Sequence, residues 1–194
     1  MEIGATKAVQ DRLKTTKIEE SKGASLVFCW DTHLTKIKGR NVLFIVNASN
    51  RYTIAMTDIE PRNWNYYTMY ISRVIHGVMQ EMGYSEDQIG QYFKMSGDTT
   101  VTKTHGRKSV GGINRMVMDA QYFGKKLEKE VKYQWELSEY LNRDICQPEG
   151  FDAYGYPSEL FKLDMERLGI ISKRKPAKII DFTKYIDTNR STNH

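Results

Sequence analysis

The segment from Lys103 to Ser109 carries the residue types best suited to chemistry. It contains one imidazole, His105, among three cations, and Ser109 at its end has a side chain that can cap a helix. The first N–H groups of a helix have no partner within the helix and attract anions. Gly111 and Gly112 would let an anion come close to the backbone. The segment therefore predicts a phosphate cradle at the start of a helix.

The same residue types also suit a metal-independent ribonuclease, which needs a base, an acid and cations for the phosphate. His105, Arg107 and Lys103 have these types, with His33 or Arg51 as further candidates. The glycine and lysine spacing of a P-loop is absent, and no serine lies in a nucleophile elbow. No Cys or His cluster has the spacing of zinc ligands. We therefore expect no cofactor and no metal site, and we favour a protein that is not an enzyme.

The positive charge of the chain is concentrated in two segments. Lys and Arg together number 29 against 24 acidic residues, which gives a net charge of +5. One segment without acids lies between Asp98 and Asp119, and the other lies between Glu166 and Asp181. Either these segments form two solvated surfaces, or their clustered cations attract phosphates or an acidic protein surface. The second segment lies mainly in the basic end of the chain.

Aromatic residues add a second kind of candidate contact. Arg51-Tyr52 and Tyr154-Gly155-Tyr156 pair residue types that stack on bases or anchor a protein partner. The predicted set of residues that bind nucleic acid or a partner is Arg51, Tyr52, Lys103, His105, Arg107, Lys108, Ser109, Arg115, Lys173, Arg174, Lys175 and Lys178.

Hydrophobic periodicity predicts an α+β domain in which several helices pack on an antiparallel sheet. The sheet is expected to consist of a three-stranded meander plus a later strand. The predicted strands cover residues 26–37, 42–46, 51–57 and 99–104. The predicted helices cover residues 6–14, 58–82, 85–96, 109–131 (with a bend near Gly124) and 158–168. We place a single domain at residues 1–171 and a basic C-terminal tail at residues 172–194.

Composition narrows the class of protein further. The chain has 194 residues, of which 40% are hydrophobic, and this composition is typical of a soluble globular protein. Its longest apolar runs, 26–30 and 42–46, are far shorter than the roughly 20 residues that span a bilayer. The first residues lack the apolar stretch of a signal peptide. We therefore expect a cytoplasmic protein without membrane contact, in which Cys29 and Cys146 are free thiols.

Several segments together resemble one uncharacterised domain family of bacteria, plasmids and phages. The most specific are Val46-Asn47-Ala48-Ser49-Asn50-Arg51-Tyr52 and Arg107-Lys108-Ser109-Val110-Gly111-Gly112. Weaker matches occur at residues 28–34, 102–104 and 141–157, so the resemblance covers about residues 1–168. It implies the fold and a mobile-element setting, and it supplies no catalytic residue.

These observations lead to one main hypothesis and two alternatives. The main hypothesis is a non-catalytic binding protein of a mobile element that engages nucleic acid, or a nucleic-acid-handling enzyme, through its basic surfaces. The first alternative is an anti-defence protein that inhibits a host defence nuclease by binding it, with aromatics such as Trp64 or Tyr156 as anchors. The second alternative is the ribonuclease, acting as a toxin. The oligomeric state stays open.

Overall fold

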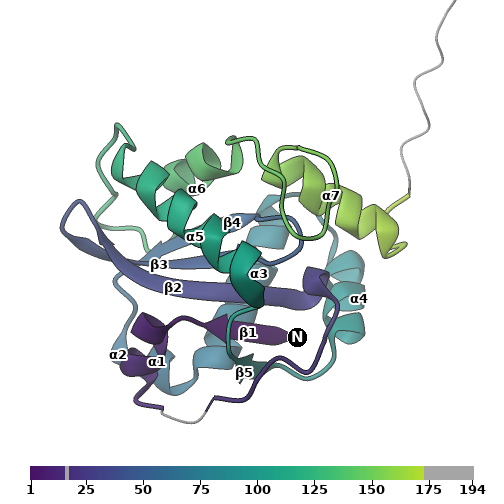
Figure 1. The fold of residues 1–194 in the computed structure, drawn as a ribbon, viewed down its shortest axis with the longest axis horizontal. Coiled ribbons are helices and arrows are strands. Elements are labelled where there is room, and N and C mark those ends of the chain that lie inside the picture. The colour runs from purple at the N-terminus through teal and green to yellow at the C-terminus, as the bar shows by residue number, and fades with distance from the viewer. Residues whose placement is uncertain (16–17, 173–194) are drawn as a thin grey trace, which may run out of the picture.

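A five-stranded mixed sheet forms the centre of the molecule (Figure 1). The computed structural model describes residues 1–15 and 18–172. The strand order is β4-β3-β2-β1-β5. The strands are β1 (Glu2–Ala5), β2 (Cys29–Ile37), β3 (Arg40–Asn47), β4 (Thr53–Thr57) and β5 (Thr100–Thr102). Strands β2, β3 and β4 form the predicted antiparallel meander, whereas β1 runs parallel to both of its neighbours.

The parallel strand β1 corrects our prediction of a purely antiparallel sheet. Residues 2–5 are short and include a glycine, so they carry almost no periodic signal of their own. The strand forms because the chain inserts it between β2 and β5, where both edges find partners and Ile3 is fully buried. The described part of the chain is therefore a mixed α/β fold rather than helices packed on an antiparallel sheet.

Helices cover both faces of the sheet (Figure 1). They are α1 (Lys7–Leu13), α2 (Pro61–Asn65), α3 (Tyr67–Glu81), α4 (Glu86–Ser96), α5 (Gly106–Gln121), α6 (Trp135–Asn142) and α7 (Pro157–Arg167). On one face, Leu43 and Ile45 share a core with residues of α3, α4 and α7. On the other face, Phe44 and Val46 share a core with residues of α5 and α6. Burial on both faces explains why β3 is apolar at each position from 42 to 46, as predicted.

Two predicted helices differ from those in the structure. The predicted helix at 58–82 is divided into α2 and α3 at Tyr66, which has non-helical backbone angles. In place of the predicted helix at 109–131, the structure has α5, which begins at Gly106 and ends at Gln121. A separate helix, α6, follows it. The predicted capping box at Ser85 is confirmed, because Ser85 and Gln88 exchange side-chain and backbone hydrogen bonds.

The basic tail cannot be compared with the structure. Its predicted binding residues Lys173, Arg174, Lys175 and Lys178 lie outside the described residues. Within residues 1–15 and 18–172, no helix has the length and apolar content needed to cross a bilayer.

Candidate functional site

A buried polar cluster surrounds Asp31 near the start of β2. The Asp31 side chain is fully buried and accepts a hydrogen bond from His105 Nδ1 at 2.7 Å. It also accepts hydrogen bonds from the backbone N–H of His105 at 3.2 Å and from the Ser109 hydroxyl. The other ring nitrogen of His105, Nε2, donates to the Glu2 carboxylate at 3.0 Å. We call Glu2, Asp31, His105 and Ser109 the Asp31 cluster.

Strand pairing explains why these residues meet. Strand β1 places Glu2 opposite Cys29 and Gly4 opposite Asp31. Alternate residues of a strand point to the same face, so Cys29 and Asp31 share the face on which α5 lies. Gly4 leaves the space that the Asp31 carboxylate occupies, since a Cβ at position 4 would lie 1.8 Å from Asp31 Oδ1. His105 follows β5 and is the N-cap residue of α5.

The environment of His105 favours its charged form. Burial favours the neutral imidazole, but hydrogen bonds to Asp31 and Cys29, together with the charge of Asp31, outweigh burial and raise the pKa of His105 to about 10. Burial opposes ionisation of Glu2, but hydrogen bonds from Ser21, Lys22 and His105 hold the pKa of this carboxyl below its usual value. His105 is therefore an imidazolium at neutral pH, hydrogen-bonded to Asp31 on one side and to Glu2 on the other.

This arrangement changes the role of the predicted phosphate cradle. The carboxylate of Asp31 accepts the His105 N–H at the N-terminus of α5, where an external anion was expected. The side chains of His105 and Ser109 are turned inward to the same carboxylate, so they do not face a ligand. The His105 side chain is 2% exposed and is protonated, so it is not a free general base. The geometry does not favour His105 as the base of the ribonuclease alternative.

Several predicted cations do meet, at a hollow beside α5. The hollow has a volume of about 350 Å³ and lies between the helix, the turn at residues 48–51 and the loop at residues 147–149. We call it the α5 hollow. Its lining includes Ala48, Arg51, Lys108, Ser109, Gly111, Gly112, Arg115, Gln147, Pro148 and Glu149.

The cations of the α5 hollow differ in their partners. Arg51 donates to the Gly112 carbonyl at 3.1 Å, and Lys108 donates to the Pro148 carbonyl at 3.2 Å. Arg115 pairs with Asp119, one turn further along α5. Within the part of the chain that the structure describes, neither Arg51 nor Lys108 forms an ion pair with a carboxylate. The side chains of Arg51 and Lys108 are therefore held by backbone carbonyls, which do not neutralise their charges. Glu149 is the one acidic residue in the lining of the α5 hollow.

The remaining predicted contacts lie elsewhere. Arg107 is exposed near the start of α5 and does not line the α5 hollow. Lys103 pairs with Glu20. Tyr52 is only 5% exposed and packs against Phe161 in the core, so it is not placed to stack on a base.

The segment from Asn47 to Tyr52 has a clear structural role. The side chain of Asn47 accepts hydrogen bonds from two backbone N–H groups of the turn and donates to the Val27 carbonyl. Asn50 donates to Asp164 of α7 at 2.9 Å. Arg51 adopts a left-handed backbone conformation with φ of 62°, which directs the chain back into β4. The turn thus connects the sheet to α7 and sets the position of the Arg51 side chain.

One family comparison covers most of the chain. Residues 2–160 match a family described as a domain of unknown function, DUF6933. The chain belongs to the DUF6933 family. The match confirms that this is an uncharacterised domain, and it spans both the Asp31 cluster and the α5 hollow of this DUF6933 protein. No curated protein and no solved structure matches the chain.

The sequence reasoning missed two members of the Asp31 cluster, Glu2 and Asp31. The signal for Asp31 is its position between Trp30 and Thr32 in a strand that is otherwise apolar or β-branched, where a carboxylate needs a buried partner. The signal for Glu2 is weaker, because β1 itself was not predicted. In this DUF6933 domain, the candidate binding site is the α5 hollow. The Asp31 cluster holds the start of α5 against β2, and α5 carries several of the residues that line the hollow.

Proposed function

We propose that this DUF6933 protein is a non-catalytic binding module that engages the phosphates of nucleic acid at the α5 hollow. The observation that carries the proposal is the approach of Arg51 and Lys108, which form no ion pair among the described residues, to one concave surface with a single acid in its lining. Arg115 lines the same surface and is paired with Asp119. Gly111 has open space where a side chain would begin, so a phosphate can come close to the helix backbone there. Arg107 extends the positive surface toward the start of α5.

The rigidity of this surface supports a binding role. The Asp31 cluster holds the first turn of α5 to β2, and the Asn47–Tyr52 turn is anchored to α7. The side chains of Arg51 and Lys108 are also held by carbonyl groups. Cations that are already placed lose less conformational entropy when a ligand binds.

The proposal is tested with two charge-matched double variants. Lys108→Gln with Arg115→Gln removes two cations from the α5 hollow. Arg73→Gln with Lys94→Gln removes two exposed cations from α3 and α4, which pack on the other face of the sheet. Fluorescence anisotropy with labelled duplex and single-stranded DNA and RNA measures the affinities of the full-length proteins near 0.1 M salt.

We expect the α5 double variant to bind roughly 10- to 100-fold more weakly than the wild-type protein, because two phosphate contacts and their released counterions are lost. The α3–α4 double variant is expected to keep most of its affinity. Equal losses in both variants would mean that only net charge matters. No binding of any nucleic acid by the wild-type protein would refute the proposal.

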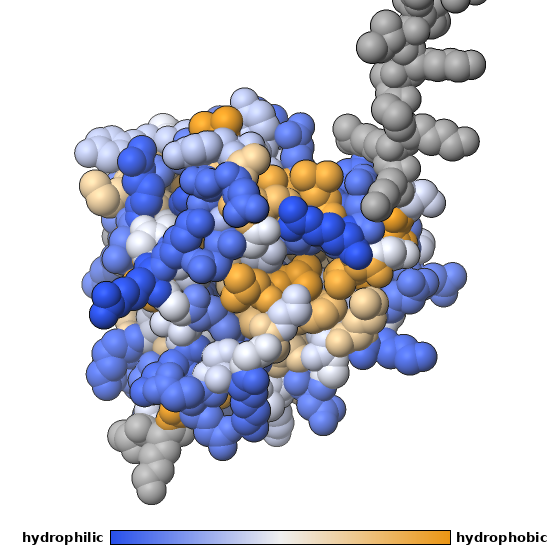
Figure 2. Space-filling model, turned by 45° about the vertical axis from the view of Figure 1, so that its right-hand side comes forward, coloured by the Kyte–Doolittle hydropathy of each residue, from blue (hydrophilic) through white to orange (hydrophobic). Residues whose placement is uncertain are grey.

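One observation favours a protein partner as the second candidate. Figure 2 shows an apolar area on the side of the molecule that carries α4 and α7, and Met95 and Leu163 of these helices are 50% and 43% exposed. Exposed apolar areas often mark protein-binding surfaces. An inhibitor of a nuclease would form a complex that persists at high salt and weakens with Leu163→Glu rather than with the α5 double variant. Trp64, one of the predicted anchors, is buried against Tyr67, whereas Tyr156 is 45% exposed.

A further inference from the structure

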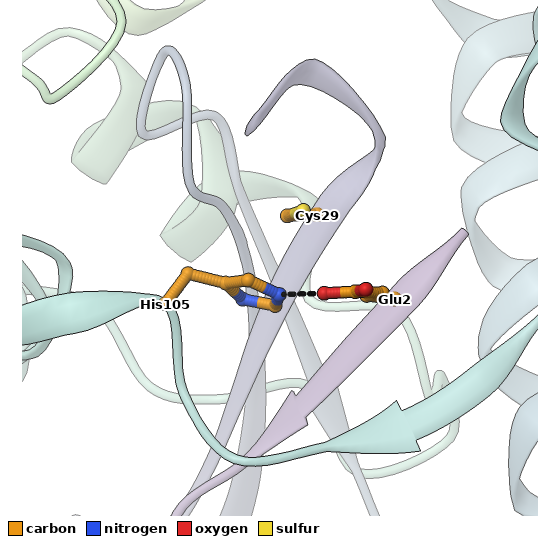
Figure 3. Close-up of side chains that lie close together, drawn as sticks. All are labelled: Glu2, Cys29 and His105. Carbon is orange, nitrogen blue, oxygen red and sulfur yellow. Dashed lines mark hydrogen bonds and ion pairs between the residues drawn. The ribbon is translucent and has the colours of Figure 1, made fainter. Parts of the chain in front are cut away.

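Two members of the Asp31 cluster, Glu2 and His105, meet the side chain of Cys29, and the three residues offer different types of metal ligand. Glu2, Cys29 and His105 each offer one ligand atom, and these atoms all lie within 4.8 Å of one another. Figure 3 shows that they come from three separate segments, namely β1, β2 and the segment that leads into α5. The three residues are far apart in the sequence, so ligand spacing along the chain gave no sign of them.

From this arrangement we propose that Glu2, Cys29 and His105 form a binding site for a divalent transition-metal ion, with Zn²⁺ the best fit. One thiolate, one imidazole and one carboxylate are all common ligands of zinc. Usual zinc bond lengths separate the ligand atoms of a tetrahedral site by about 3.5 Å. The Glu2 oxygen and His105 Nε2 are 3.0 Å apart, and no two of the three ligand atoms are more than 4.8 Å apart.

The residues around the three ligands are arranged as outer partners of a metal site. A metal-bound histidine usually donates its second ring N–H to a carboxylate, and His105 Nδ1 lies 2.7 Å from Asp31 Oδ1. The Glu2 carboxylate is oriented by the Ser21 hydroxyl at 2.6 Å and by the backbone N–H of Lys22 at 2.8 Å. Among the described residues, Cys29 Sγ donates to the carbonyls of residues 24 and 25, at 3.7 and 3.5 Å. His105 Nε2 is directed to Glu2, and Cys29 Sγ lies within 4.8 Å of both of these ligand atoms.

Binding depends on the protonation of the ligands. Only an unprotonated imidazole nitrogen and a thiolate bind a metal ion, so the ion takes the place of any proton on His105 Nε2 and on Cys29 Sγ, while the Nδ1 proton stays on the hydrogen bond to Asp31. The bound ion then supplies the positive charge that the imidazolium otherwise provides between Glu2 and Asp31.

Cobalt titration tests the site, because a thiolate bound to Co²⁺ gives a charge-transfer absorption band. The full-length protein, without a polyhistidine tag, is first treated with a chelator and then titrated with Co²⁺, and the band is displaced with Zn²⁺. We expect one ion per chain and a thiolate-to-cobalt band. Cys29→Ser should abolish the band. Cys146→Ser should retain it, because this second buried cysteine lies in a separate apolar cluster with Phe151 and Leu160.

A surface variant keeps the test decisive if Cys29→Ser does not fold. Ser21 is exposed, and Ser21→Ala removes one hydrogen bond to Glu2 and one exposed hydrogen bond from the backbone N–H of Gly23. We expect this variant to bind Co²⁺ about tenfold more weakly with an unchanged circular dichroism spectrum. A wild-type protein that shows no band, or a band that depends on Cys146 instead of Cys29, would overturn the proposal. Neither result bears on the binding of nucleic acid at the α5 hollow.

Discussion

Replacing Asp31 with alanine is expected to lower the free energy of unfolding by about 3–5 kcal/mol, because the change leaves a buried imidazolium without its main partner. The carboxylate is fully buried and accepts hydrogen bonds from His105 and Ser109. The substitution also leaves the backbone N–H of His105, at the start of α5, without its hydrogen-bond acceptor. Urea denaturation followed by circular dichroism, in the presence of a chelator, measures the effect.

Asp11→Ala is the control for the loss of an aspartate. Asp11 forms an exposed ion pair with Lys7 within α1, so its removal should change the free energy of unfolding by no more than about 0.5 kcal/mol. Asp31→Asn keeps the shape of the side chain and should cost less than Asp31→Ala. A cost of Asp31→Ala within 1 kcal/mol of that of Asp11→Ala would show that the Asp31 cluster does not hold α5 in place.

Replacing Gly4 with alanine should destabilise the protein by about 3 kcal/mol. The added Cβ would lie 1.8 Å from Asp31 Oδ1 and 3.0 Å from the Thr104 Cα. The Thr104 contact is with backbone, so rotation of one side chain cannot relieve both contacts. Strand β1 must shift relative to β2, or the Asp31 carboxylate must leave its hydrogen bonds. Thermal and urea denaturation measure the loss.

Gly77→Ala provides the matched substitution at an unconstrained glycine. Gly77 lies inside α3, and a Cβ there meets no atom within 4 Å. Alanine has the higher helix propensity, so this variant should be more stable by about 0.5–1 kcal/mol. If Gly4→Ala were as stable as the wild-type protein, the close packing of β1 on Asp31 would not exist in solution.

Local patterns in the sequence predicted the elements that carry strong signals of their own. The meander, the capping box at Ser85 and the helix that became α7 all follow from periodicity and turn residues within a short window. Strand β1 does not, because Glu2–Ala5 becomes a strand only when β2 and β5 supply its two edges. The mixed character of the sheet was therefore outside the reach of local reasoning.

The candidate site was predictable only where it depends on residues that are close together in the sequence. The basic stretch of α5 was visible in the sequence, and Lys108, Arg115 and Arg51 do line one hollow. The inward direction of His105 was not visible, because it depends on Asp31, which lies 74 positions earlier in the chain. A helix N-terminus that an internal carboxylate satisfies looks the same in a sequence as one that awaits a phosphate.

The salt dependence of nucleic-acid binding tests the central claim most directly. For duplex DNA, the logarithm of the affinity falls with the logarithm of salt concentration by about 0.9 for each phosphate neutralised. The Lys108→Gln, Arg115→Gln variant should therefore show a slope that is shallower by about 0.9 to 1.8 than that of the wild-type protein, the lower value applying if Arg115 stays paired with Asp119. The Arg73→Gln, Lys94→Gln variant should keep the wild-type slope. Identical slopes for all three proteins would contradict the assignment of the α5 hollow as the phosphate-binding surface.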